Sequence, residues 1–270
     1  MLEVAEALLG ELGLARSAEL LGATIEAATQ REASYVDFLI SLLGAERDER
    51  RHRSYETRLR LAGLPHRRGL GDFDFDFATG VDRSLVNELA SCAFVANAAN
   101  VVFLGPPGVG KTHLAVGLAL SALEAGHSVY FATMARMVAD LEGVVSPRRL
   151  RTYLAPKVLV IDEIGYRALS HGAAGIFFEV IAARYETGSI ILTSNKGFAE
   201  WGTLVGDPVL ATAILDRLLH HATVLNIRGE SYRLKDRTKQ RLPGGLLPQA
   251  AEAMAKGGDA EHHALGSYPL

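Results

Sequence analysis

Hydrophobic residues recur at helical spacing through the first 64 residues of the chain. A stripe at positions i, i+3, i+4, i+7 and i+8 consists of Tyr35, Phe38, Leu39, Leu42 and Leu43. This spacing gathers apolar side chains on one side of a helix and is typical of an amphipathic helix. The pattern therefore predicts that the chain opens with a small all-helical domain, which we delimit as residues 1–68.

Farther along the chain, short continuous apolar runs alternate with longer helical stretches. A helix is expected to begin near Asp82. Strands are expected at residues 101–104, 128–132, 157–162, 189–193 and 223–227, with helices at 113–120, 134–141, 172–185 and 207–221. Apolar strands that alternate with helices predict a parallel sheet covered by helices on both faces. The expected fold class is therefore α/β.

The segments around this core also have distinct patterns. Residues 72–77 alternate Asp and Phe, which favours an edge strand or a short extended segment that docks its Phe side chains. The end of the chain is rich in Gly, Pro and Ala. We expect residues 69–240 to form the second domain and residues 241–270 to be a disordered tail.

Composition indicates a globular protein in a reducing compartment. Hydrophobic residues make up 49% of the chain and charged residues 22%, which is typical of soluble domains. Cys92 is the single cysteine, so no internal disulfide is possible. The N-terminus is acidic without a signal-peptide pattern, and no uncharged apolar run reaches the roughly 18 residues that span a bilayer. We expect a cytoplasmic protein without membrane contact.

The strongest chemical signal is a glycine-rich loop between the first expected strand and its helix. The sequence G-P-P-G-V-G-K-T consists of Gly105, Pro106, Pro107, Gly108, Val109, Gly110, Lys111 and Thr112. It fits the phosphate-binding P-loop in the strand–loop–helix context that this motif requires. Lys111 would contact the β- and γ-phosphates of ATP, and the Thr112 hydroxyl would hold Mg²⁺.

Two acidic residues follow the strand expected at 157–162. We expect this strand to lie beside the P-loop strand, so that Asp162 completes the Mg²⁺ site. Glu163 is the candidate general base that polarises a water molecule for attack on the γ-phosphate. The alternative is a pair of helix-capping acids. A glutamate here favours water as the attacking group and argues against a small-molecule kinase.

Two further polar residues are candidates with open alternatives. Asn195 follows an apolar strand and would hydrogen-bond the γ-phosphate or the attacking water, although an ordinary turn asparagine fits as well. Arg217 follows Asp216 on an otherwise apolar helix. It is either a surface ion pair with an acid or an arginine finger that reaches a neighbouring subunit's γ-phosphate.

With these residues in place, the chain resembles the IstB family, the AAA+ ATPase helper proteins of insertion-sequence transposition, and more distantly the DnaC helicase loaders. The resemblance covers about residues 1–237. It depends on G-P-P-G-V-G-K-T-H-L at 105–114, V-L-V-I-D-E-I-G-Y at 158–166, T-S-N at 193–195, E-W-G at 200–202, G-D-P-V-L-A at 206–211 and, above all, L-D-R-L-L-H-H-A-T-V-L-N-I-R-G-E-S-Y-R-L-K at 215–235.

The resemblance implies an AAA+ ATPase core with a role for each matched residue. Residues Gly105 to His113 would bind nucleotide as Walker A, and Asp162 and Glu163 would be Walker B. Asn195 would be sensor 1 and Arg217 the trans-acting finger. Arg233 would be sensor 2. The implied function is ATP-dependent assembly of a homo-oligomer on target DNA, which assists a partner transposase of the IstA type; the alternative is a DnaC-like helicase loader.

Basic clusters fit a role on DNA, although the chain has a net charge of −3. They lie at residues 46–68, at 228–241, and at Arg148, Arg149 and Arg151. Such clusters bind the phosphate backbone without reading sequence, so we expect salt-sensitive, non-specific binding to double-stranded DNA. Each cluster could instead be a solvated helix face, and in residues 46–68 the spacing also fits i,i+4 ion pairs. A small-molecule kinase and a non-hydrolysing scaffold are the remaining alternatives.

Overall fold

The computed structural model describes residues 1–78, 80–142 and 146–232. The predicted tail at 241–270, Arg233 and most of the basic residues of the cluster at 228–241 lie outside the described residues. The domain boundaries at residues 68 and 240 stay predictions. No helix in the described parts of the chain is both long and apolar enough to cross a membrane.

The N-terminal region consists of three helices, as predicted. They are α1 (Leu2–Glu11), α2 (Ala15–Gln30) and α3 (Tyr35–Ala62). Ser34 caps α3 by accepting a hydrogen bond from the Asp37 amide, and Gly63 ends the helix in the left-handed conformation. The buried Glu46 carboxylate accepts from the amides of Arg16 and Ser17 at the start of α2, which joins α2 to α3.

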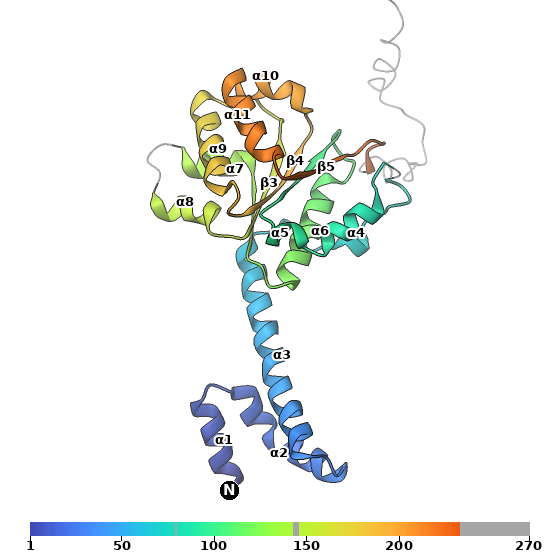
Figure 1. Cartoon of the computed structure of the whole chain (residues 1–270), viewed down its shortest axis with the longest axis vertical. Coiled ribbons are helices and arrows are strands. Elements are labelled where there is room, and N and C mark those ends of the chain that lie inside the picture. Colours follow the sequence, from blue (N-terminus) through green and yellow to red (C-terminus); the bar gives the residue numbers. More distant parts are fainter. Residues whose placement is uncertain (79, 143–145, 233–270) are drawn as a thin grey trace, which may run out of the picture. The chain divides into compact units, whose positions relative to one another are not determined.

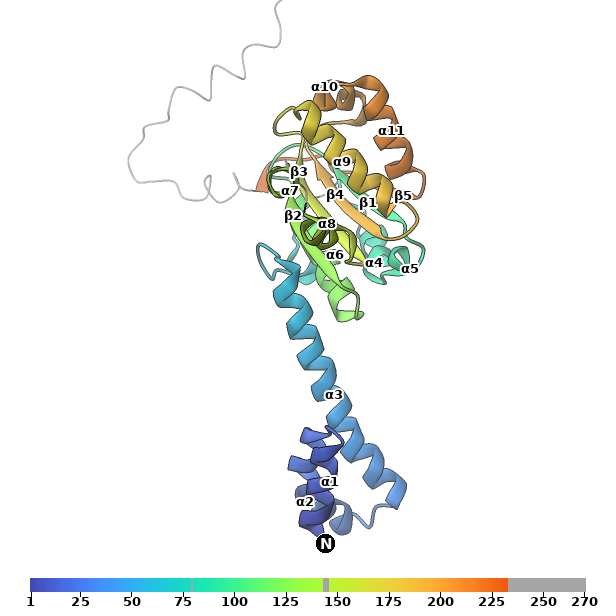
Figure 2. The ribbon, with the colours of Figure 1, turned by 90° about the vertical axis from the view of Figure 1, so that its left-hand side faces the viewer.

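The part of the described chain that follows α3 contains a parallel sheet (Figure 1). Its strands follow the order β2-β3-β4-β1-β5, as Figure 2 shows. The strands are β1 (Asn100–Leu104), β2 (Val129–Thr133), β3 (Val158–Ile164), β4 (Ser189–Ser194) and β5 (Ala222–Asn226). All four strand pairs are parallel. The predicted α/β class and the position of every expected strand are therefore confirmed to within a few residues.

Side chains alternate between two cores because successive residues of a strand point to opposite faces. In β1, Val101 and Phe103 belong to one core, whereas Val102 and Leu104 belong to the other. The first core is covered by α4 (Arg83–Ala90), α5 (Ala93–Ala96), α6 (Lys111–Glu124) and the end of α3. The second is covered by α7 (Met134–Leu141), α8 (Pro147–Leu154), α9 (His171–Arg184), α10 (Trp201–Val205) and α11 (Pro208–Leu219). Figure 2 looks onto the face that α8 and α9 cover.

The expected neighbour of β1 is wrong, and so is the edge strand, which was one of two alternatives for the Asp–Phe segment. Strand β3 does not lie beside β1, because β4 lies between them. The Asp–Phe segment is not an edge strand: the 3-10 helix η1 (Leu70–Asp72) leads into a turn at residues 75–77. The expectation that this segment docks a Phe side chain is nevertheless confirmed, since Phe73 is buried in the core beside α6. A second 3-10 helix, η2 (Phe198–Glu200), precedes α10.

Candidate functional site

The P-loop connects β1 to α6 and is enclosed by the segment that follows β5. Gly105 has φ 148° and Gly108 has φ 86°, conformations that L side chains rarely adopt. A Cβ atom on Gly105 would lie 2.2 Å from the Ile227 carbonyl oxygen, and one on Gly108 would lie 2.1 Å from Ser231 Oγ. Both positions therefore require glycine, because of their φ angles and because the segment after β5 leaves no room for a side chain.

Lys111 is the first residue of α6, and its side chain crosses the loop that precedes it. The side chain is buried, and its Nζ donates to the carbonyl oxygens of Gly105 at 2.8 Å and Pro106 at 2.7 Å. The positive end of the helix dipole and the loop amides lie in the same place. The ammonium group and these amides form a cradle that fits the phosphates of a nucleotide.

Asp162 lies at the centre of a buried group of oxygen atoms at the carboxyl edge of the sheet. Its carboxylate accepts from Thr112 Oγ1 at 3.0 and 3.1 Å and from Thr193 Oγ1. Asp162 is 3% exposed, so these hydroxyls replace water around the carboxylate. A carboxylate and a hydroxyl are the hard oxygen ligands that Mg²⁺ prefers, so Thr112 and Asp162 fit this ion.

Glu163 is turned out of the strand by a break in pairing between β3 and β4. The register shifts between Ile161 and Ile164, and Glu163 has φ 65°, which is rare for a residue other than glycine. Its amide donates to Thr193 Oγ1 at 3.1 Å, while its side chain is the exposed position of the strand. A bulge of this kind redirects a side chain, and here it leaves the Glu163 carboxylate open to solvent beside the Asp162 group.

Asn195 follows β4 at the same edge. The backbone amide of Asn195 donates to the Ile164 carbonyl at 3.2 Å, which holds the end of β4 against the end of β3. Its Oδ1 atom is buried and, within the part of the chain that the structure describes, has no hydrogen-bond partner. A buried polar atom normally has a hydrogen-bond partner, so the Asn195 side-chain oxygen is suited to accept a hydrogen bond from a ligand group or a water molecule.

Arg217 lies at the opposite, amino edge of the sheet. The neighbouring Leu218 carbonyl accepts from the Asn100 side chain at 2.9 Å, and Asn100 begins β1, whereas the P-loop follows the end of β1. A strand of this length spans about 16 Å, which exceeds the reach of the Arg217 side chain. The guanidinium lies 5.0 Å from the Phe178 ring centroid and donates to Ala213, and no ion pair among the described residues joins it to Asp216. The structure therefore does not bring Arg217 to the P-loop of its own chain.

Residues that the sequence analysis did not assign also surround the loop. Thr193 connects Asp162 to the Glu163 backbone amide. The sequence feature that could have identified it is its position as a polar residue at the end of an apolar strand. The Tyr232 amide donates to the Gly108 carbonyl at 2.9 Å. Phe73 packs against Gly110, since a Cβ atom there would lie 2.6 Å from its ring.

The side chain of His113, a residue predicted to bind nucleotide, contacts the segment that precedes the core. Its Nε2 lies 2.9 Å from the Gly69 carbonyl oxygen, and its ring meets Phe73 edge-on. The neighbouring His66 ring is also in edge contact with His113. Burial, followed by the charges of His113 and Arg68, lowers the pKa of His66. The side chain of His113 thus fixes the linker that leads into the core, and its contact with nucleotide stays a prediction.

The arginines of the basic clusters are mostly exposed, and some of them form ion pairs. In α3, Arg50 pairs with Glu46 and Arg53 with Glu49, each at 2.8 Å, as the i,i+4 spacing indicated. The other exposed arginines of this cluster are Arg47, which pairs with the adjacent Asp48, and Arg51, Arg60, Arg67 and Arg68. The second set of exposed arginines lies on α8 and comprises Arg148, Arg149 and Arg151.

The whole-chain sequence has clear relatives. A family model described as IstB-like ATP binding protein matches residues 7–240. An insertion sequence IS21 putative ATP-binding protein of Pseudomonas aeruginosa is 46% identical over 258 residues, which cover 94% of this chain and 97% of the relative. An insertion sequence IS5376 putative ATP-binding protein of Geobacillus stearothermophilus is 46% identical over 228 residues, or 83% of this chain and 90% of the relative.

Solved structures agree with the fold. The crystal structure of DnaI superposes with a TM-score of 0.50 at 22% sequence identity, covering 61% of this chain and 90% of that one. At this level of identity the likeness concerns the fold alone. The α/β core therefore shares the fold of DnaI.

Proposed function

Because the chain belongs to the IstB-like ATP-binding protein family, we propose that it is an ATPase that assembles as an oligomer on target DNA and assists a partner transposase of the IstA type. The observation that carries the enzymatic part is the buried contact of Thr112 with Asp162 beside an outward-facing Glu163. The names of the relatives, which are insertion-sequence proteins, support the transposition role. The helicase-loader alternative has only a fold-level likeness in its favour.

The proposed chemistry divides the roles among the residues at the carboxyl edge. Thr112 and Asp162 would hold Mg²⁺, which would neutralise the charge that develops on the γ-phosphoryl group as it is transferred to water. Lys111 contacts the β- and γ-phosphates. Glu163 accepts a proton from the attacking water, and Asn195 orients that water or the γ-phosphate. Thr193 is a positioning residue because it contacts both Asp162 and the Glu163 amide.

Arg217 is proposed to act on the neighbouring subunit. A finger residue stabilises charge on the transferring phosphoryl group, and its own chain holds Arg217 at the wrong edge of the sheet for this role. A head-to-tail arrangement would place the amino edge of one subunit against the carboxyl edge of the next. Hydrolysis would then require assembly, because a single chain provides only part of the site.

DNA binding is proposed to depend on the exposed arginines. Phosphate contacts release counterions, so the affinity for a random duplex should fall about 10³-fold or more between 50 and 200 mM salt if six phosphates are contacted. Charge-removing substitution of Arg67 and Arg68 should weaken binding uniformly across sequences. Arg53→Ala is the matched control, since Glu49 already pairs with Arg53. An affinity that does not change with salt would contradict phosphate contacts.

The experiment that tests the proposed function is a measurement of particle mass by sedimentation or mass photometry. The protein is measured with a non-hydrolysable ATP analogue, with a random duplex, with both and with neither. A large complex that requires nucleotide and DNA together is the expected result. A monomer under all four conditions would contradict the proposal. The Lys111→Ala variant, which removes the phosphate contact, is expected to stay small throughout.

A further inference from the structure

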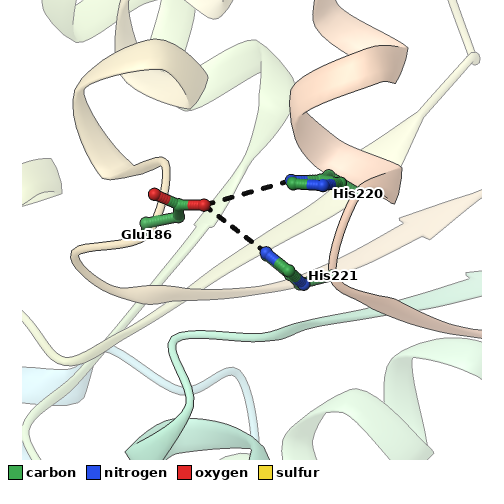
Figure 3. Close-up of side chains that lie close together, drawn as sticks. All are labelled: Glu186, His220 and His221. Carbon is green, nitrogen blue, oxygen red and sulfur yellow. Dashed lines mark ion pairs between the residues drawn. The ribbon is translucent and has the colours of Figure 1, made fainter.

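Three side chains with metal-binding atoms meet at the amino edge of the sheet, away from the P-loop. Glu186 lies in the turn between α9 and β4, and His220 and His221 follow the end of α11 (Figure 3). One ligand atom from each lies within 4.8 Å of the other two. Neither the nucleotide chemistry nor the finger role uses these residues.

The distances fit a small metal ion. The Glu186 Oε1 atom lies 3.4 Å from His221 Nε2 and 4.0 Å from His220 Nδ1. Ligands at zinc bond lengths of about 2.0–2.1 Å in a tetrahedron lie about 3.3 Å apart, so the first pair is already spaced for coordination and the second needs a small closure. All three side chains are about half exposed, which leaves room for a water molecule or another ligand.

The cluster is held by the backbone on both sides. Asn100 of β1 donates its amide to the His221 carbonyl at 2.7 Å, and the Thr187 amide after Glu186 donates to Arg184 at 3.0 Å. The Tyr185 hydroxyl lies 2.6 Å from His220 Nδ1, and its ring stacks on the imidazole. Because both segments are attached to strands, the backbone around the three side chains needs little reorganisation, whereas His220 Nδ1 must exchange its contact with the Tyr185 hydroxyl for the ion.

We propose that Glu186, His220 and His221 form a binding site for a divalent transition metal of the Zn²⁺ type. Imidazole nitrogens with one carboxylate are ligands that suit zinc, whereas Mg²⁺ and Ca²⁺ prefer oxygen ligands alone. The ion joins the α9–β4 turn to the end of α11, three residues from Arg217. The site goes beyond the proposed ATPase function and can be measured without ATP or DNA.

The test is a Zn²⁺ titration of the full-length, tag-free, metal-stripped protein by calorimetry, with Co²⁺ absorption to report coordination. We expect saturation at one ion per chain, a tetrahedral-type Co²⁺ spectrum and a higher Tm with Zn²⁺. His220→Ala, His221→Ala and Glu186→Gln should each weaken binding by about tenfold or more. His52→Ala and His171→Ala remove exposed histidines elsewhere and should leave binding unchanged.

The outcomes separate the site from general surface binding. A fall in affinity in the three cluster variants but not in the two controls supports the proposal. It is overturned if the wild-type protein shows no saturable binding, or if the cluster variants bind as tightly as the wild type. The unfolding temperature of each variant without metal shows whether it is folded, and any one folded cluster variant is sufficient for the comparison.

Discussion

The two edges of the same sheet differ in how their functional side chains are held. At the carboxyl edge, Asp162 is buried and accepts hydrogen bonds from two threonines, and Lys111 is buried in the P-loop. At the amino edge, Glu186, His220 and His221 are exposed, and the Arg217 guanidinium rests on the Phe178 ring. One edge forms a nearly complete site within the chain, whereas the other leaves Glu186, His220 and His221 exposed and Arg217 half-buried.

This difference is consistent with the proposed site shared between subunits. A group that acts on its own chain's ligand can be fixed by buried contacts, because its partner is always present. A group that acts on a neighbour must stay accessible until the neighbour arrives. The contrast makes separate predictions for the two edges, which begin here with the largest expected effect.

Arg217→Ala tests the outward-facing edge. Loss of a finger residue should lower the turnover of the assembled protein by about 10³-fold or more, because charge on the transferring phosphoryl group is no longer stabilised. ATP binding should be retained, since Arg217 does not reach its own P-loop. Turnover is measured by phosphate release and binding with a fluorescent ATP analogue, and Arg136→Ala is the control for an exposed arginine. If the Arg217→Ala protein turns over ATP at the normal rate, Arg217 is not a finger residue.

Glu163→Gln tests the base at the carboxyl edge. The amide keeps the shape of the side chain but cannot accept the proton from water, so turnover should fall by about 10²–10⁴-fold. Oligomers bound to ATP should accumulate, which particle-mass measurements detect. Glu179→Gln, an exposed glutamate on α9, is the matched control. If Glu163→Gln hydrolyses ATP at the normal rate, the base must be another group.

Arg184→Met tests the framework beneath the amino edge. The buried guanidinium donates to five carbonyl oxygens, those of Tyr153, Leu154, Pro156, Lys157 and Ser189. Burial lowers its pKa to about 10, so it remains charged at neutral pH. Its loss should lower the free energy of unfolding by about 3 kcal/mol, because buried carbonyls lose their donors.

Chemical denaturation measures the effect of Arg184→Met, with Arg148→Met on the exposed face of α8 as the control. A loss below about 1 kcal/mol would mean that water replaces the guanidinium at these carbonyls. In that case the strands alone would determine the geometry of the amino edge.

Thr193→Val has the smallest expected effect at the nucleotide site. The substitution keeps the shape of the side chain but removes the hydroxyl that contacts Asp162 and the Glu163 amide. Supporting contacts of this kind typically contribute about 10-fold in activity, so kcat should fall by about that factor. Thr187→Val, which changes an exposed threonine in the turn before β4 at the opposite edge, should leave kcat unchanged. An unchanged kcat in Thr193→Val would limit that hydroxyl to a structural role.

The sequence predicted the local elements better than their arrangement. Apolar runs such as Val101–Leu104 identified the strands because their burial on both faces leaves a continuous hydrophobic signal. Strand order was not readable, since consecutive strands need not be neighbours: β4 separates β3 from β1. The Phe73 segment formed a turn because docking beside α6 satisfied its apolar side chain without strand pairing.

The candidate site was predictable where a motif fixes residue spacing, as in the P-loop. The role of Thr193 was missed because its two contacts depend on the bulge at Glu163, which no local sequence pattern predicts. The cluster of Glu186 with His220 and His221 joins residues more than thirty positions apart, so it appears only once the sheet is assembled. Contacts of this kind are determined by the topology of the fold and cannot be predicted from one segment of the sequence.

The most direct test of the two-edge account is a mixing experiment with the Glu163→Gln and Arg217→Ala proteins, both of which keep an intact P-loop and can therefore enter the same assembly. Each alone should lose nearly all hydrolysis, the first because its base is missing and the second because its finger is missing. In an equal mixture about a quarter of the interfaces of a head-to-tail ring would join an intact base to an intact finger. The account predicts that ATP hydrolysis on DNA returns to about that fraction of the wild-type rate. A mixture as inactive as its components would contradict a site shared between subunits.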